Sequence, residues 1–176
     1  MSHTLRIEYL VAVAALAACG RGTPSAAADT TAAAAPVAAV ASPAGGDLAS
    51  SRTFNSLLGD FQFSVPDVWE QRYTATERAI APEFPGAKSV SEFMFLPMSG
   101  GTPPTLLTII RYAEPEWKTI SASGKAPGPV VAEGGGRVFV AQLLTANPFP
   151  AGSEDAVAIQ PMLLAPEQVS KAMRIQ

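Results

Sequence analysis

The chain has 176 residues, of which 48% are hydrophobic, and it carries a formal net charge of −3 at pH 7. Twelve of its 15 acidic residues and ten of its 12 basic residues lie from Arg52 onward, so this part is nearly neutral. A nucleic-acid-binding protein normally shows a dense cluster of Lys and Arg, and this sequence has none. We therefore expect no nucleic-acid partner.

The first element in the chain is a short apolar segment near the N-terminus. Met1–Arg6 carries positive charge, and Tyr9–Ala18 is an apolar run of ten residues. A run of this length is typical of an export signal and is too short to span a bilayer as a helix. Glu8 weakens the signal because it offsets the charge of Arg6. We predict a signal peptide over residues 1–18.

The only cysteine of the chain follows directly. Leu16-Ala17-Ala18-Cys19 resembles the lipobox of bacterial lipoproteins, a large aliphatic residue and two small ones before cysteine. The resemblance implies that Cys19 carries a diacylglycerol and begins the mature chain, and that two or three fatty chains hold the protein at a membrane. Gly20 follows in place of an inner-membrane retention aspartate, which favours the outer membrane, facing the periplasm or cell surface, if the organism has one. The alternative is an ordinary secretory peptide that leaves Cys19 as a free thiol.

Residues 19–52 predict a tether. Ala, Thr, Pro, Ser and Gly dominate this segment, and it contains no aromatic residue that could build a core. Pro24, Pro36 and Pro43 interrupt the helix that its alanines favour. As a flexible coil it would separate the two ends by roughly 30 Å on average, and by roughly 100 Å when extended. A passive spacer is one interpretation, and an alanine helix that binds a partner is the other.

The composition changes near Arg52, and we predict one globular domain over residues 53–176. All eight phenylalanines and both tryptophans lie there. About 125 residues can bury a sufficient core without disulfides.

Strand signals dominate the first half of this domain. Phe61–Val65 alternates apolar and polar residues, and Pro66–Trp69 reads as the turn that ends it. Further strands are expected near residues 72–80, at Ser91–Leu96 with Phe93 and Phe95 on one face, and at Leu106–Tyr112, which is apolar on both faces like a central strand. Loops are expected at residues 82–86 and 98–104.

Helical signals enter in the second half. Glu114-Pro115-Glu116 places proline and acids in a first turn, and Gly124 is a natural stop. Residues 130–132 and 137–144 flank Gly134-Gly135-Gly136 and predict a hairpin. Ser153 can cap a helix over residues 156–164 that Pro161 kinks, and residues 165–173 extend or restart it. The order β-β-β-β-α-β-β-α predicts an α+β fold, a mostly antiparallel sheet packed with two or three helices.

Several segments together resemble a known class of exported domain. Phe61–Tyr73, the apolar strand Leu106–Tyr112, Trp117 and Val138–Val140 are similar to PsbP-like and DcrB-like domains, which are α-β-α sandwiches often carried on lipoproteins. The resemblance implies a binding or assembly role and transfers no catalytic residue.

Few residues of the mature chain are suited to catalysis. The lone histidine, His3, lies in the predicted signal peptide, and lipid occupies Cys19, which removes the side chains of nucleophilic triads and of His or Cys metal sites. Gly134-Gly135-Gly136 lacks the Lys-Ser/Thr of a phosphate loop. We therefore expect no catalytic residue, no cofactor and no metal, and predict that the protein is not an enzyme.

Carboxylates and Ser/Lys pairs are the remaining acid–base candidates. Two acidic pairs lie where helix N-termini favour acids, and we interpret them as capping residues. Glu70 beside Trp69 is interpreted as solvated, and the spacing of Ser121 after Lys118 as incidental. The acidic pairs are Glu114 with Glu116 and Glu154 with Asp155, and the other lysines that would need a nearby serine are Lys88, Lys125 and Lys171.

Three functions remain open at this point. The favoured one is a lipid-anchored, non-catalytic module that binds an envelope protein, and the alternatives are a small-molecule or lipid binder and an enzyme using carboxylates or Ser/Lys. Exposed aromatic side chains would favour the first, and a pocket the second. The four candidates are Trp69, Tyr73, Tyr112 and Trp117, which we interpret as core residues.

Overall fold

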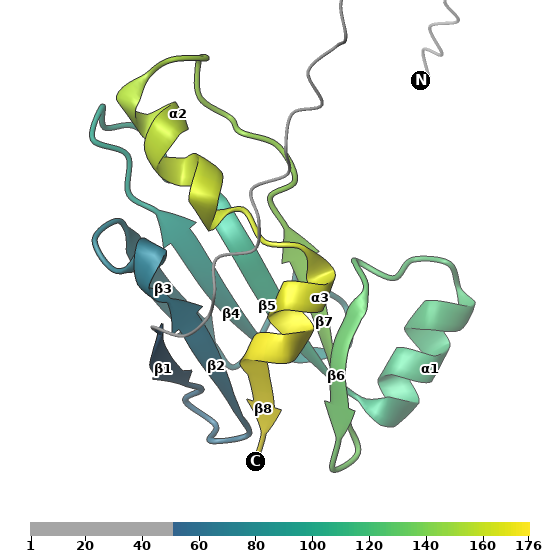
Figure 1. The fold of residues 1–176 in the computed structure, drawn as a ribbon. Coiled ribbons are helices and arrows are strands. Elements are labelled where there is room, and N and C mark those ends of the chain that lie inside the picture. The colour runs from purple at the N-terminus through teal and green to yellow at the C-terminus, as the bar shows by residue number, and fades with distance from the viewer. Residues whose placement is uncertain (1–50) are drawn as a thin grey trace, which may run out of the picture. The chain divides into compact units, whose positions relative to one another are not determined.

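The computed structural model describes residues 51–176, and these form the predicted α+β fold (Figure 1). Its strands are β1 (Ser51–Asn55), β2 (Phe61–Pro66), β3 (Tyr73–Arg78), β4 (Ala87–Phe95), β5 (Thr105–Ala113), β6 (Val130–Gly134), β7 (Arg137–Leu143) and β8 (Met173–Ile175). Its helices are α1 (Glu114–Ala122), α2 (Glu154–Ile159) and α3 (Pro166–Ala172), with short 3₁₀ helices η1 (Asp67–Trp69) and η2 (Gln160–Met162).

Two antiparallel sheets make up the domain. One has five strands in the order β3-β4-β5-β7-β6, and the other has three in the order β1-β2-β8. β5 is apolar on both faces because it lies in the middle of the larger sheet, between β4 and β7. This confirms the central strand that the sequence predicts.

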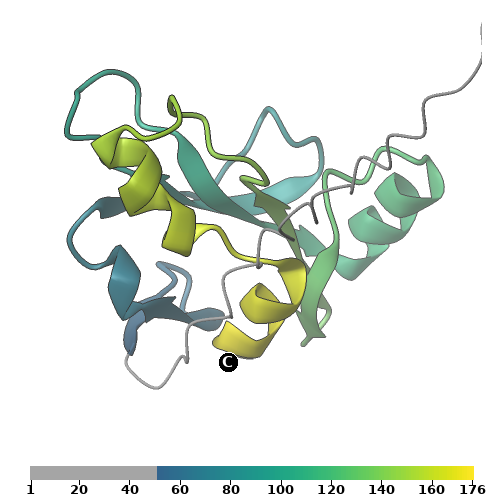
Figure 2. The ribbon, with the colours of Figure 1, turned by 45° about the horizontal axis from the view of Figure 1, so that its top comes forward.

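The two faces of the five-stranded sheet bury separate cores. Phe93 and Phe95 of β4 point into the larger core, which lies against the three-stranded sheet, α2 and α3. Val90 points to the opposite face, where Tyr112 and the α1 residue Trp117 form a smaller core. In Figures 1 and 2, α1 accordingly stands apart from α2 and α3.

The predicted hairpin is confirmed, and its glycines explain its tightness. Gly135 and Gly136 connect β6 to β7 with φ angles of +58° and +71°. A two-residue hairpin turn of type I′ needs positive φ at both central positions, where glycine carries no steric penalty.

Two strands were not predicted. β1 begins at Ser51, two residues before the expected start of the domain, and it pairs with β2. β8 takes up Met173, which was predicted to be helical, and pairs with the other edge of β2. Neither segment is long enough and regular enough for a period of two to be recognised.

The predicted helix over residues 156–164 is wrong at its C-terminal end. α2 stops at Ile159, η2 follows, and Leu163 is extended with a ψ of 117°. Pro161 has no N–H to continue the helical ladder, and Pro166 favours an extended residue before it, so α3 starts anew.

Two sequence predictions concern the membrane. No helix within residues 51–176 is both long and apolar enough to cross a bilayer. Cys19, the predicted signal peptide and residues 19–50 of the tether lie outside the described residues.

Candidate functional site

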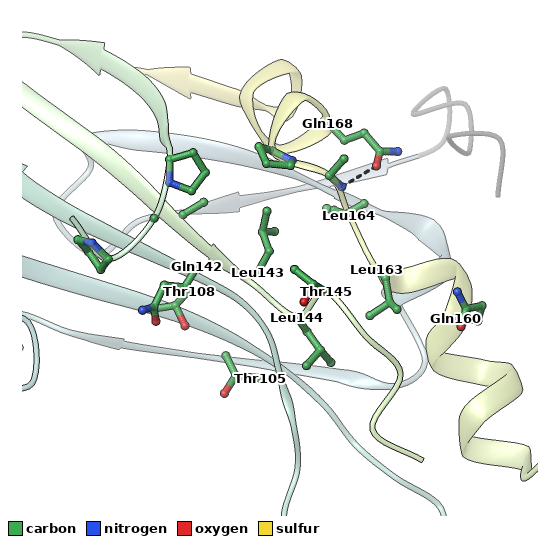
Figure 3. A pocket seen from close by; sticks show the side chains of 16 residues that line it. Thr105, Thr108, Gln142, Leu143, Leu144, Thr145, Gln160, Leu163, Leu164 and Gln168 are labelled. Carbon is green, nitrogen blue, oxygen red and sulfur yellow. Dashed lines mark hydrogen bonds between the residues drawn. The ribbon is translucent and has the colours of Figure 1, made fainter. Parts of the chain in front are cut away.

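A groove of about 820 Å³ runs along the outer edge of β7 (Figure 3). Its walls come from the start of β5, from the segment 127–129 before β6, from residues 141–145 at the end of β7, and from residues 160–168 between η2 and α3. We call it the β7-edge groove. Sequence distance between these four segments reaches about sixty residues, so only the folded sheet brings them together.

The edge is open because β6 is shorter than its neighbour. β6 pairs with β7 only up to Val130, opposite Val140, and the Ala141 N–H then donates to the Pro129 carbonyl over 3.0 Å. A Cβ on Gly128 would lie 2.0 Å from the Ala141 oxygen, so this close approach requires glycine. Beyond this point the chain leaves β7, and the last residues of the strand have no outer neighbour among residues 51–176.

The free edge exposes main-chain hydrogen-bonding groups. Leu144 N–H donates to the Leu106 carbonyl over 2.9 Å, on the side of β5. Main-chain groups of successive residues in a strand point to opposite sides. The N–H and C=O of Leu143 therefore point away from β5 and into the groove.

The lining of the groove is electrically neutral. All sixteen residues that line it are Thr, Gln, Leu, Pro, Ala or Gly. Thr108 and Gln142 face each other across β5 and β7 on one side of the sheet. Leu163 and Leu164 lie on the other side, against the larger core. Such a lining can offer apolar contacts and neutral hydrogen bonds, and it has no side chain that titrates near neutral pH.

The buried carboxylate of Asp155 holds α2, the helix that precedes the groove wall formed by residues 160–168. Ser153 caps α2 as predicted, because its Oγ accepts the Ala156 N–H over 3.2 Å. Asp155 in the same turn is 3% exposed and accepts the Met98 N–H (2.8 Å), the Ser99 N–H (3.1 Å), the Ser99 hydroxyl (2.5 Å) and Arg72 (3.2 Å). These bonds tie α2 to the loop after β4.

The same bonds favour the ionised form of the Asp155 carboxyl group. The Ser99 hydroxyl, the two main-chain N–H groups and the charge of Arg72 hold the pKa of Asp155 below its usual range, against desolvation, which raises it. At the other end of α2, Asn147 Nδ2 donates to the Ala156 carbonyl (2.7 Å) and to Gln160 Oε1 (3.2 Å). Gln160 is thereby oriented at the end of the groove.

The predicted acid–base candidates lie elsewhere. Glu114 and Glu116 occupy the first turn of α1, where they contact Lys118 (2.7 Å) and Lys88 (2.8 Å) on the exposed side. Ser121 donates to the main-chain carbonyl of Lys118 rather than meeting its ammonium group.

The second acidic pair and the isolated glutamate also have partners. Glu154 and Asp155 both turn toward Arg72, at 3.4 and 3.2 Å. Glu70 is solvated as predicted and lies 3.7 Å from Arg52. Lys125 and Lys171 are exposed. None of these carboxylates and lysines lines the β7-edge groove.

The four aromatic candidates are mainly core residues, as predicted. Trp69 and Tyr112 are buried in the larger and the smaller core respectively. Tyr73 packs on Trp69 with ring centroids 5.9 Å apart, and Trp117 packs on Tyr112 at 5.5 Å. They do not share one groove, because the sheet separates the two pairs.

No protein-family model, curated protein or solved structure matches this chain. The resemblances to lipoproteins and to PsbP-like domains therefore stay predictions. Within residues 51–176 no group of three His, Cys, Asp or Glu side chains could hold a metal ion. The groove is the feature from which a function can be argued.

Sequence reasoning did not find the groove residues. Thr, Gln and Leu at the end of a strand carry no chemical signature, and we interpreted residues 137–144 only as half of a hairpin. One signal was present: Pro127-Gly128-Pro129 directly before a strand predicts that the strand starts late and leaves its neighbour uncovered.

Proposed function

We propose that this chain is a lipid-anchored, non-catalytic protein of the bacterial cell envelope that binds another envelope protein through the β7-edge groove. The observation that carries the proposal is a neutral groove of about 820 Å³ beside a free strand edge. Strand edges that are neither paired nor covered are natural attachment sites for another chain.

The predicted anchor and tether fit this role. A lipid on Cys19 would hold the start of the chain at a membrane, and the tether would let the domain search a shell of roughly 30 to 100 Å around it. Such an arrangement raises the effective concentration of the groove near membrane-bound partners. Modest affinity is then sufficient for function.

A small-molecule or lipid ligand is the second candidate. Two features favour it: the groove volume lies within the range of roughly 300–1,000 Å³ that is common for ligand sites, and four leucines contribute apolar surface to it. These are Leu143, Leu144, Leu163 and Leu164.

Photo-crosslinking in intact cells separates these candidates. A photoreactive amino acid is placed at Gln142 or Leu164 in the groove, and at Gln71, which is exposed and does not line it, as control. We expect one protein adduct from both groove positions and none from position 71. Adducts of lipid mass alone would favour the second candidate, and protein adducts from position 71 only would contradict the groove as the site.

Cys19→Ala tests the anchor independently. We expect the variant to lose fatty-acid labelling and membrane association, and to form less of the groove adduct because its effective concentration falls. Labelling that persists in Cys19→Ala would contradict lipid attachment at this residue.

A further inference from the structure

We infer that the occupant of the β7-edge groove is an extended, uncharged segment of a partner protein that adds to β7 as a further strand. This inference rests on the proposed function and names the chemistry of the partner. It is carried by three features: the free main-chain groups of Leu143, the neutral lining and the different character of the two sides of the groove.

The first feature is the strand edge. An added strand would lie roughly 4.8 Å from β7, in line with β6 but beyond Pro129, where β6 has not yet begun. There it would meet the N–H and C=O of Leu143, the donor and acceptor that one residue offers to an antiparallel or a parallel neighbour. Main-chain pairing of this kind supplies affinity without regard to sequence.

The second feature is charge. A charged side chain that entered the groove would lose hydration and find no opposite charge on the sixteen lining residues. Elsewhere the domain carries exposed ion pairs such as Lys88 with Glu116, so its neutrality here is local. The partner segment should therefore be free of Asp, Glu, Lys and Arg.

The third feature is the difference between the two sides. Side chains of an added strand alternate between the faces of the sheet. On one face they would meet Leu163 and Leu164, and on the other Thr108 and Gln142. The preferred segment therefore alternates aliphatic residues with small polar ones.

One other segment of the chain shares the uncharged character expected of the groove's occupant. Residues 30–46 carry no charged side chain and are mostly Ala, Val, Thr and Pro. They lie outside the described residues, and their prolines cannot donate a main-chain hydrogen bond. We therefore assign the groove to a partner, and the experiment includes a variant that tests this segment.

The test uses the full chain in detergent micelles and a displayed library of random dodecapeptides. We expect the selected peptides to lack charged residues and to alternate as described. Each selected peptide is then synthesised with one main-chain N-methyl group at each position in turn. Strand addition predicts that methylation weakens binding roughly tenfold at the position whose N–H would donate to the Leu143 carbonyl, and changes it little at the two neighbouring positions, whose N–H groups would point away from β7.

Matched variants locate the binding on β7. Gln142→Glu and Gln168→Glu preserve side-chain shape and add a charge to the groove, and Gln168→Glu keeps the acceptor that binds the Ala165 N–H at 2.8 Å (Figure 3). We expect roughly tenfold weaker peptide binding for each. Gln71→Glu adds the same charge outside the groove and should bind normally. Leu143→Pro removes the proposed donor without breaking a bond to β5 and should weaken binding similarly.

Contrary outcomes separate the two levels of the proposal. Enriched charged peptides would overturn the uncharged character of the partner segment. Binding that is insensitive to N-methylation, while the glutamate variants still weaken it, would overturn strand addition but leave the groove as a binding site. Binding unaffected by every groove variant would overturn the proposed function as well. Tighter peptide binding after deletion of residues 30–46 would assign the groove to this segment of the chain and overturn the partner assignment.

Discussion

The domain contains two buried aspartates, one at each end of the five-stranded sheet, and their surroundings differ. Asp155, beside the end where β5 begins, is satisfied by several directed hydrogen bonds to one loop. Asp60, beside the end where β5 finishes, lies 3.0 Å from Arg111 and 4.0 Å from Arg137, and only its other oxygen accepts a hydrogen bond, from Ser56 (2.6 Å). One carboxylate anchors a loop, and the other compensates buried positive charge.

The difference separates what holds the fold from what shapes the site. The pairs of Asp60 connect the start of β2 with β5 and β7, so this group joins the two sheets across the larger core. Asp155 connects α2 with the loop after β4 and so places the helix that leads to Gln160 in the groove. Losing Asp60 should affect the whole domain, whereas losing Asp155 should mainly affect the groove.

The largest expected effect comes from Asp60→Ala. The substitution leaves Arg111 with no carboxylate partner in a largely buried position, and breaking a buried pair in this way typically costs about 3–5 kcal/mol. Chemical denaturation should show this as a lower free energy of unfolding and, since the sheets depend on each other, as one cooperative transition. A loss below about 1 kcal/mol would mean that Arg111 is rehydrated easily and that this pair does not join the sheets.

A smaller loss of stability is expected for Asp155→Asn. The amide keeps one acceptor, but its NH₂ faces N–H and hydroxyl groups that need an oxygen. Hydrogen exchange should therefore accelerate around residues 98–99 and 154–160, with little change in β5, and peptide binding in the groove should weaken.

Glu154→Gln is the matched control for this variant. Glu154 is the neighbouring residue, is exposed and lies 3.4 Å from Arg72, so its amide variant should leave both exchange and binding unchanged. Equal effects at the two positions would mean that the charge of Arg72 places α2, and not the hydrogen bonds that Asp155 accepts from Met98 and Ser99, which we call the Asp155 clamp.

The two aspartates also show how far sequence patterns reach. The strand Phe61–Val65, the central strand and the hairpin glycines were predictable because alternation, apolar runs and positive φ are local properties. Asp155 was predictable as a first-turn acid of α2, but its bonds to residues 98 and 99 span more than fifty residues. Nothing in the sequence around Asp60 indicates that two arginines from other strands approach it.

The groove could not be predicted from the sequence for a related reason. The groups that would pair with an added strand belong to the main chain of Leu143 and leave no mark in the sequence, and the shape of the groove depends on where β6 starts relative to β7. Register and strand ends are set by pairing between distant segments, and single-sequence patterns do not encode them. The segment Pro127-Gly128-Pro129 narrows the possibilities, but the wall formed by residues 160–168 comes from a break in a predicted helix.

The smallest expected effect is the pH dependence of the stability that the Asp155 clamp contributes. Its pKa is lowered in the folded protein, chiefly by the Ser99 hydroxyl, relative to about 3.9 in the unfolded chain. The carboxylate therefore contributes stability above that unfolded value and loses it as pH falls through the folded pKa. The difference in free energy of unfolding between wild type and Asp155→Asn should shrink below about pH 4.

Salt distinguishes this contribution from those of surface acids. The pKa values of Glu83, Glu114 and Glu116 are also lowered, by bonds that include those from Arg78, Lys118 and Lys88, but these glutamate side chains are far more exposed than that of Asp155. Salt near 1 M shortens the screening length to about 3 Å and should flatten the acid response that such pairs cause. At this salt concentration the difference in free energy of unfolding between wild type and Asp155→Asn should still shrink as the pH falls. The reason is that directed hydrogen bonds to a carboxylate that is 3% exposed are screened little. If salt removed the pH dependence of this difference in free energy of unfolding, Asp155 would be acting as a surface charge. The Asp155 clamp would then not be what positions the wall of the groove.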